Sequence, residues 1–213
     1  MRRRIKYYTA ARMLIQDITE CRDLVSLQAL LYMILFLQAT SNLSGCYSFL
    51  GIALRAALRM GLHRHLPQVK LTCIELESRR RVFYVIRQMD TYVSALLGFP
   101  LLLQEEDIDQ PLPTEVDDEY ITRDAIQAPP AEAPGSIFQA FNAHVRLMRI
   151  LAKVIKHIYP MKSIEDAANI ESMGIYVVSY AKIKEIEGEL QDWYKQLPIQ
   201  WRPSPEGPIE VIR

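Results

Sequence analysis

The apolar and polar residues follow a helical rather than a strand periodicity along most of the chain. Apolar positions recur three and four residues apart, and no stretch alternates convincingly with the two-residue period of a strand. The pattern predicts six helical segments, at about residues 3–18, 26–39, 46–60, 73–97, 136–159 and 163–197. The last segment leaves open a break near Gly174, which would divide it in two. We therefore expect an all-α fold.

Residues that typically cap helices support these boundaries. Thr72 and Glu75 form a capping-box pattern at the start of the fourth segment. Gly61 is suited to end the helix before it, and Gly98 is suited to end the fourth helix. Ser26 is the predicted N-cap of the second helix.

The character of the chain changes in the middle. Residues 104–119 carry eight acidic side chains and no Lys or Arg, with prolines close by. This composition predicts a Pro/acid-rich irregular segment whose acids are solvated. Residues 128–135 are predicted to be a linker, helices follow within 136–197, and the Pro-rich residues 198–213 are predicted to be a tail. We expect residues 1–213 to form one multi-helix domain.

The charge balance argues against direct binding of nucleic acid. Lys+Arg and Asp+Glu number 25 each, so the formal net charge is zero. A domain that grips phosphates by itself usually carries a basic excess. The longest strongly apolar run covers nine residues, 29–37, whereas a membrane span needs about 20. We therefore expect neither nucleic-acid contacts nor a membrane span.

No pattern in the sequence indicates a catalytic or metal site. Cys21, Cys46 and Cys73 are widely separated and form no C-x-x-C pair, so neither a zinc site nor a disulfide framework is suggested. His63 and His65 form a His-x-His pair, but a metal site needs a third ligand, and no spacing supplies one. No nucleophile accompanies the acidic segment, and phosphate-binding glycine motifs are absent from the sequence. We expect a protein that is not an enzyme and holds no cofactor.

Three consecutive arginines, Arg79 to Arg81, lie in the fourth predicted helix. Successive helical residues point about 100° apart, so the three side chains cannot share a face. The helical wheel gives one buried stripe, formed by Arg79, Val82, Phe83, Ile86, Met89, Asp90, Val93 and Leu97. It gives a wetter side, formed by Glu77, Arg80, Arg87 and Thr91. Helical spacing also allows ion pairs between Arg87 and Asp90 and between Glu77 and Arg81.

A charge on the buried stripe must find a partner. An unpaired buried charge is costly, so we expect Arg79 to be buried and to pair with Glu75 or with an acid of residues 105–109. Arg80 and Arg81 should be more exposed. The triplet is then a structural element of the helix and not a nucleic-acid patch.

Three motifs in fixed order carry a resemblance to a known family. They read "ALRMGLHR", then "ESRRRVFYVIRQMDTYVSALLGFP", then "EEDIDQPLP". Together they resemble the fungal-specific transcription factor domain, the xylanolytic-activator-type regulatory domain in the middle of fungal binuclear zinc-cluster regulators. The resemblance covers about residues 7–118, and the later "ELQDWYKQLP" looks like the family's closing helix. The signature falls on Gly61, Leu62, His63, Arg64, Arg79, Arg80, Arg81, Asp90, Gly98, Pro100, Asp107, Asp109 and Pro113.

The resemblance implies a nuclear, helical regulatory domain whose signature is structural and not catalytic. It implies control of transcription through effector sensing, intramolecular restraint or dimerisation, with protein partners, self-association or a small-molecule effector. Relatives usually carry six clustered cysteines that bind two zinc ions and read DNA, whereas this chain has three scattered cysteines. A stand-alone interaction protein without a DNA-binding module therefore stays open, and so does a small-molecule-binding helical domain or enzyme. Two departures from the family pattern are Tyr84, where tryptophan is frequent, and Phe99, where arginine is frequent.

We expect the isolated chain not to bind duplex DNA specifically at physiological salt. Its zero net charge leaves little counterion release to drive association. An electrophoretic mobility-shift assay tests this directly. A shift at submicromolar protein that survives competitor DNA would contradict the expectation.

Overall fold

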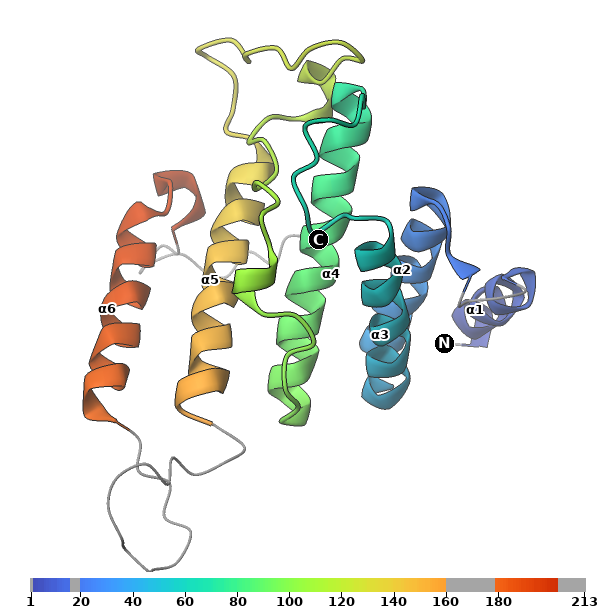
Figure 1. Cartoon of the computed structure of the whole chain (residues 1–213), viewed down its shortest axis with the longest axis horizontal. Helices are drawn as coiled ribbons and strands as arrows, with labels where there is room; N and C mark the ends of the chain where they lie inside the picture. The colour runs from blue at the N-terminus through green and yellow to red at the C-terminus, as the bar shows by residue number, and fades with distance from the viewer. Residues whose placement is uncertain (1, 16–19, 160–178, 203–213) are drawn as a thin grey trace, which may run out of the picture.

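The computed structural model describes residues 2–15, 20–159 and 179–202 of the chain (Figure 1). The helices in these ranges are α1 (Arg2–Leu14), α2 (Leu24–Ala39), α3 (Leu43–Arg59), α4 (Cys73–Leu97), α5 (Ile137–His157) and α6 (Tyr180–Gln196). Short 3₁₀ helices lie at Glu105–Asp107, Asp118–Tyr120 and Ile199–Trp201. The only pairing of strand type in the described part is an isolated bridge between Ile121 and Ile126. The predicted all-α class is confirmed.

The predicted boundaries hold best for α4, which spans its predicted range, and for α5. Helix α5 lies within two residues of its predicted range at each end. Helix α1 ends before its predicted limit, and residues 16–18 of that prediction lie outside the described residues. The same is true of residues 163–178, including the break considered at Gly174, and of residues 203–213 in the predicted tail.

The caps predicted for α3 and α4 are present. The side chain of Thr72 accepts a hydrogen bond from the amide of Glu75 at 3.2 Å, and the Glu75 carboxylate accepts one from the amide of Thr72 at 2.9 Å. This reciprocal pair is a capping box. Gly61 follows α3 with a φ of 67°, and Gly98 ends α4 with a φ of 66°. Both values lie in the left-handed region that glycine enters without a steric penalty.

The predicted starts of α2 and α3 are wrong. Asp23, not Ser26, is the N-cap of α2, and its carboxylate accepts a hydrogen bond from the amide of Ser26 at 2.8 Å. Asn42 caps α3, accepting from the amide of Gly45 at 3.0 Å, so α3 begins before the predicted Cys46. In both cases a polar residue a few positions earlier than expected satisfies the free amides of the first turn.

The helices lie side by side in chain order (Figure 1). Helix α2 packs on α3, α3 on α4, α4 on α5 and α5 on α6, and α2 also touches α4. Helix α4 therefore has neighbours on both flanks. The row places α1 at one end and α6 at the other.

The apolar core is concentrated in one half of this row. Its fully buried side chains come mainly from α2, α3 and α4, and include Leu27, Leu30, Ile34, Leu50, Ala53, Ala57, Phe83, Ile86 and Val93. Helix α5 adds Val145 to this cluster, and the described part of α6 adds none. Helix α5 is also connected to the acidic segment by hydrogen bonds and ion pairs of its polar face.

The helical wheel identifies the core face of α4 correctly but misjudges the opposite side. Val82, Phe83, Ile86 and other stripe residues are buried as expected. Glu77, Arg87 and Thr91 were expected on the wetter side and are buried as well. The reason is that α5 and the acidic segment cover the flank of α4 that faces away from α3. A wheel drawn for one helix contains no information about a second neighbour.

The three arginines each find a different partner, and the carboxylate partner predicted for Arg79 is wrong. Arg79 donates to the carbonyl oxygen of Met60 at 2.7 Å and forms no ion pair within 4.0 Å to the acids expected for it. Arg80 pairs with Glu77 at 2.6 Å. Arg81 pairs with Asp118 and stacks on a phenylalanine ring of α5, with its Cζ atom 3.6 Å from the ring centroid. All three side chains are partly buried.

Glu77 joins the acidic segment to α4. Its side chain is only 2% exposed, and it accepts hydrogen bonds from the amide of Thr114 at 3.0 Å and from the Thr114 hydroxyl at 2.7 Å. Arg80 and Arg81 supply the opposite charge, at 2.6 and 3.9 Å. A buried carboxylate with this many partners holds the segment in one place along the helix.

We expect Glu77→Ala to destabilise the chain by about 3–5 kcal/mol, the usual cost of removing one partner of a buried ion pair. The matched control is Glu187→Ala, because Glu187 is exposed on α6 and such surface substitutions usually change stability by about 0.5 kcal/mol or less. Urea melts of the parent and both variants measure the difference. Equal losses in the two variants would contradict the role assigned to Glu77.

Candidate functional site

The predicted signature residues around the α3–α4 turn form a clip between two distant segments. The amide of Leu62 donates to the carbonyl of Ala57 at 2.9 Å, a bond typical of a Schellman end, and the side chain of Leu62 is buried. The carbonyl of His63 accepts from the amides of Asp109 at 3.2 Å and Gln110 at 3.1 Å. The turn after α3 and the acidic segment are thereby fastened together.

The Gln110 side chain completes this clip. Its Nε2 atom donates to the carbonyls of Leu62 at 3.0 Å and Arg64 at 3.1 Å. The backbone carbonyl of Gln110 accepts from the hydroxyl of Tyr84 at 2.6 Å, which adds α4. Neither Gln110 nor Tyr84 was among the predicted signature residues. Tyr84 had drawn notice only as a departure from the family pattern, and nothing in the sequence marked Gln110.

The remaining signature residues hold the segment after α4. The Asp90 carboxylate accepts from the amide of Leu102 at 3.3 Å and lies 3.4 Å from Arg87, which confirms the predicted Arg87–Asp90 pair. Asp107 accepts from an amide at the start of the 3₁₀ helix Glu105–Asp107. The carbonyl of Pro113 accepts from Asn142 of α5 at 2.8 Å. These contacts support the backbone, and Asp107 also lines a cavity of about 510 Å³ together with His63, Arg64 and Asp109.

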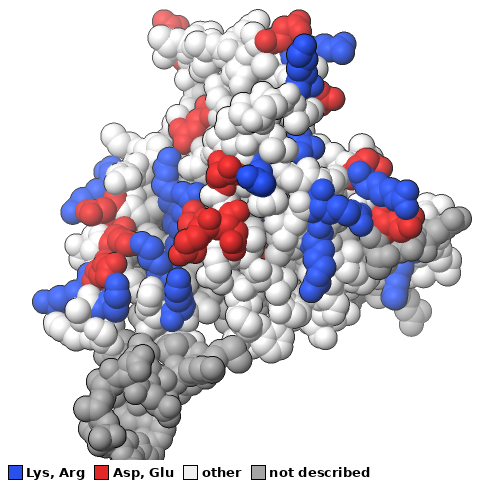
Figure 2. All heavy atoms as spheres, viewed as in Figure 1, with Lys and Arg blue, Asp and Glu red and all other residues white. Residues whose placement is uncertain are grey.

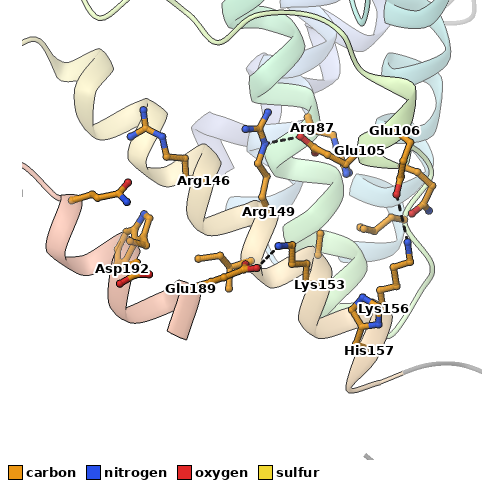
Figure 3. Close-up of a pocket in the computed structure, with 16 residues that line it drawn as sticks. Arg87, Glu105, Glu106, Arg146, Arg149, Lys153, Lys156, His157, Glu189 and Asp192 are labelled. Atoms are coloured by element: carbon orange, nitrogen blue, oxygen red, sulfur yellow. Dashed lines mark hydrogen bonds and ion pairs between the residues drawn. The ribbon is translucent and has the colours of Figure 1, made fainter. Parts of the chain in front are cut away.

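A groove of about 580 Å³ runs beside α5 (Figure 3). Its walls come from α5, α6 and the segment after α4, and Arg87 contributes from α4. The labelled side chains in Figure 3 are mostly charged and lie on facing elements. The groove is therefore a polar gap between the outer helices.

A ladder of basic residues on α5 lines this groove. Arg146, Arg149, Lys153 and Lys156 are spaced three and four residues apart and share one face of the helix. Each of them pairs with an acid. Arg146 lies 3.6 Å from Glu115, and Arg149 lies 2.7 Å from Glu105. Lys153 pairs with Glu189 of α6, and Lys156 lies 3.8 Å from Glu106. The expectation that the acidic segment is only solvated is wrong for Glu105, Glu106 and Glu115, because α5 lies within reach, and for Asp118, which pairs with Arg81.

A second cavity of about 510 Å³ adjoins the first. Its walls are mainly apolar and come from the last turn of α4, from Phe99 and Pro100, and from the C-terminal half of α5. The two cavities share Leu101, Gln104 and Lys156. These shared residues lie at the border between the charged cavity, called here the charged half of the groove, and the apolar cavity, called its apolar half.

Helix α6 closes the charged half through Trp193. The indole Nε1 of Trp193 donates to the carbonyl of Ala143 on α5 at 2.7 Å, and the ring lines the groove. Ile186 in α6 and Leu197 at its C-terminal cap are buried as well. The sequence signal for this contact was the "ELQDWYKQLP" motif, but it did not indicate what Trp193 touches.

The cysteines do not fit the zinc cluster implied for longer relatives. Cys21 and Cys46 are buried in the apolar core, and Cys73 stands apart at the start of α4. Burial raises the pKa of the Cys46 thiol, which disfavours the thiolate that zinc requires. In the described ranges, no group of three or more His, Cys, Asp or Glu residues is placed to hold a metal ion.

The charged half and the surface around it carry side chains of both signs. The described residues that line the charged half include no serine, threonine or cysteine nucleophile. Acidic and basic atoms are interspersed over α5 and α6, on the left in Figure 2, and no field of one sign covers this face. Among the described helices, none has both the length and the hydropathy to cross a membrane.

Comparison with known proteins places these features in a family. The model of the family "Fungal specific transcription factor domain" matches residues 2–195. The chain is 41% identical to Activator of stress genes protein 1 of Candida albicans, over 93% of this chain and 21% of that protein. It is 39% identical to Activator of stress genes 1 of Saccharomyces cerevisiae, over 95% of this chain and 20% of that protein. It is 29% identical to Transcriptional activator protein acu-15 of Neurospora crassa, over 82% of this chain and 18% of that protein.

The chain thus spans about a fifth of the length of these relatives. The relatives are named as transcriptional regulators and not as enzymes. No solved structure matches the chain significantly.

Proposed function

The chain belongs to the family of the fungal specific transcription factor domain, and from this membership we propose that it is a regulatory domain that controls transcription without touching DNA. It would act in the nucleus, as fungal transcription factors generally do. It would need no cofactor of its own, and its zero net charge fits a domain that leaves phosphate contacts to other parts of a regulator.

The observation that carries this proposal is the groove of two contiguous cavities between α4, α5 and α6. Pockets of about 300–1,000 Å³ with apolar walls and a few polar groups are the usual size and character of small-molecule sites. We infer that the domain senses an effector there. Effector sensing is thus preferred here to intramolecular restraint alone.

The outer helices are suited to respond to an occupant. The described part of α6 adds nothing to the main apolar cluster. It packs on α5 with Ile186 buried, and one indole hydrogen bond and the Lys153–Glu189 pair add to this contact. Exposed ion pairs are worth only about 0–1 kcal/mol each. A ligand that binds one arrangement of α5 and α6 better than another can shift the population toward that arrangement at a low cost in free energy.

Filling the groove tests this function. We expect Ala152→Trp, which projects an indole into the charged half, to change reporter transcription when the chain is fused to a heterologous DNA-binding domain. The matched control is Ala10→Trp on the exposed face of α1. Output from Ala152→Trp that equals the parent at equal protein abundance would argue against effector sensing in the groove.

A second function, self-association, is favoured by the outer face of α2. The sixteen residues of α2 include no charged side chain, yet Val25, Tyr32 and Leu35 are exposed, and Tyr32 is 74% exposed. Their spacing of seven and three places them on one face. A charge-free exposed helix face is typical of an interface.

We expect this face to mediate a concentration-dependent dimer that Tyr32→Glu abolishes, because a carboxylate would be desolvated in the interface. Light scattering coupled to size-exclusion chromatography measures the mass. The control is Tyr180→Glu, an equally exposed tyrosine on α6. A parent chain that remains monomeric at high micromolar concentration would exclude self-association through α2.

A further inference from the structure

The two halves of the groove differ in charge, and one residue stands at their junction. Among the described residues that line the apolar half, Lys156 is the only one with a formal charge. The acids Glu105, Glu106 and Glu189 line the charged half only. A ligand that occupies the apolar half therefore meets a single charge, and it is positive.

The apolar half has room for an extended hydrocarbon group. Ala95 comes from α4, Leu151, Val154 and Ile155 come from α5, and Phe99 lies in the connecting segment. These side chains surround about 510 Å³. Burying hydrocarbon against such walls is favourable in proportion to the area removed from water.

Lys156 is the member of the basic ladder that is most easily given a new partner. Its ammonium group lies 3.8 Å from Glu106, and the two side chains are 56% and 74% exposed. Arg149 is held more closely, at 2.7 Å from Glu105. A loose and solvated pair contributes little, so an incoming anion can replace Glu106 without leaving a buried charge unpaired.

We propose that the groove binds an amphipathic organic anion. Its hydrocarbon part lies between α4 and α5 in the apolar half, and its carboxylate pairs with Lys156 at the junction. This inference rests on the proposed effector-sensing function and adds the chemical class of the effector. Lys156 is then the residue that selects an anion over a neutral or cationic molecule of the same shape.

The probes are dodecanoate, dodecanol and dodecyltrimethylammonium, titrated below micelle-forming concentrations into the 213-residue chain by isothermal titration calorimetry. We expect dodecanoate to bind about tenfold or more tightly than the other two, the effect of one charge-assisted contact. Lys156→Met, which keeps the length and removes the charge, should reduce dodecanoate affinity to the level of the alcohol. Because the Lys156 side chain is exposed, the variant should keep the fold of the parent, and circular dichroism checks this.

Two further variants separate a specific site from surfactant adsorption. Lys182→Met removes an exposed, ion-paired lysine of α6 outside both cavities, and it should leave dodecanoate binding unchanged. Ala95→Trp fills the apolar half and should abolish binding of dodecanoate and dodecanol alike. Dodecanoate binding that survives Ala95→Trp is adsorption and overturns the proposal.

The remaining outcomes are equally decisive. The proposal that the ligand is an anion is overturned by equal affinity for dodecanoate and dodecanol or by a preference for the ammonium probe. It is also overturned if Lys156→Met binds dodecanoate with full affinity. Absence of binding by all three probes also overturns it. The effector-sensing function is judged separately, because the reporter response to Ala152→Trp requires no knowledge of the ligand.

Discussion

The buried carboxylate of Glu77 is the constraint on which the arrangement of this domain depends. A charge that is withdrawn from water must be met by opposite charge and by hydrogen-bond donors. Arg80 and Arg81 provide the charge from the same helix, but the donors come from Thr114, more than thirty residues later. The acidic segment is therefore required to run back along α4. The Arg87–Asp90 pair and the Leu102 amide repeat this arrangement nearer the other end of the helix.

Once the segment lies along α4, its other contacts follow. Its backbone reaches the turn after α3 through His63 and Gln110, and its acids face the basic side of α5. The domain thus combines two kinds of cohesion. Helices α2 to α4 are joined by apolar packing, which is strong and insensitive to salt. Helix α5 shares in the apolar packing through Val145 and Phe141, but its basic face meets α6 and the acidic segment through solvated ion pairs, which are weak and exchangeable.

This division explains how one domain can be both stable and responsive. The family signature lies at the clip and along α4, where it maintains the scaffold, and it does not line the apolar half of the groove except at Gly98 and Pro100. The groove lies where cohesion is weakest, between α5, α6 and the segment after α4. Variation in the groove can therefore alter what is bound without disturbing the scaffold. Under the proposed function, that separation allows one fold to serve different effectors.

The sequence by itself determined the elements whose causes are local. The all-α class, the Thr72–Glu75 capping box and the glycine ends at Gly61 and Gly98 depend on residues within one or two helical turns, so periodicity and residue type were sufficient. The core stripe of α4 was also predictable, because the strongest apolar face meets the core. Only the tertiary structure decided the burial of Glu77, Arg87 and Thr91, the partner of Arg79 and the pairing of the acidic segment with α5. These features depend on which distant segment covers the second side of α4, and the residue pattern of a single helix does not indicate which segments pack against it.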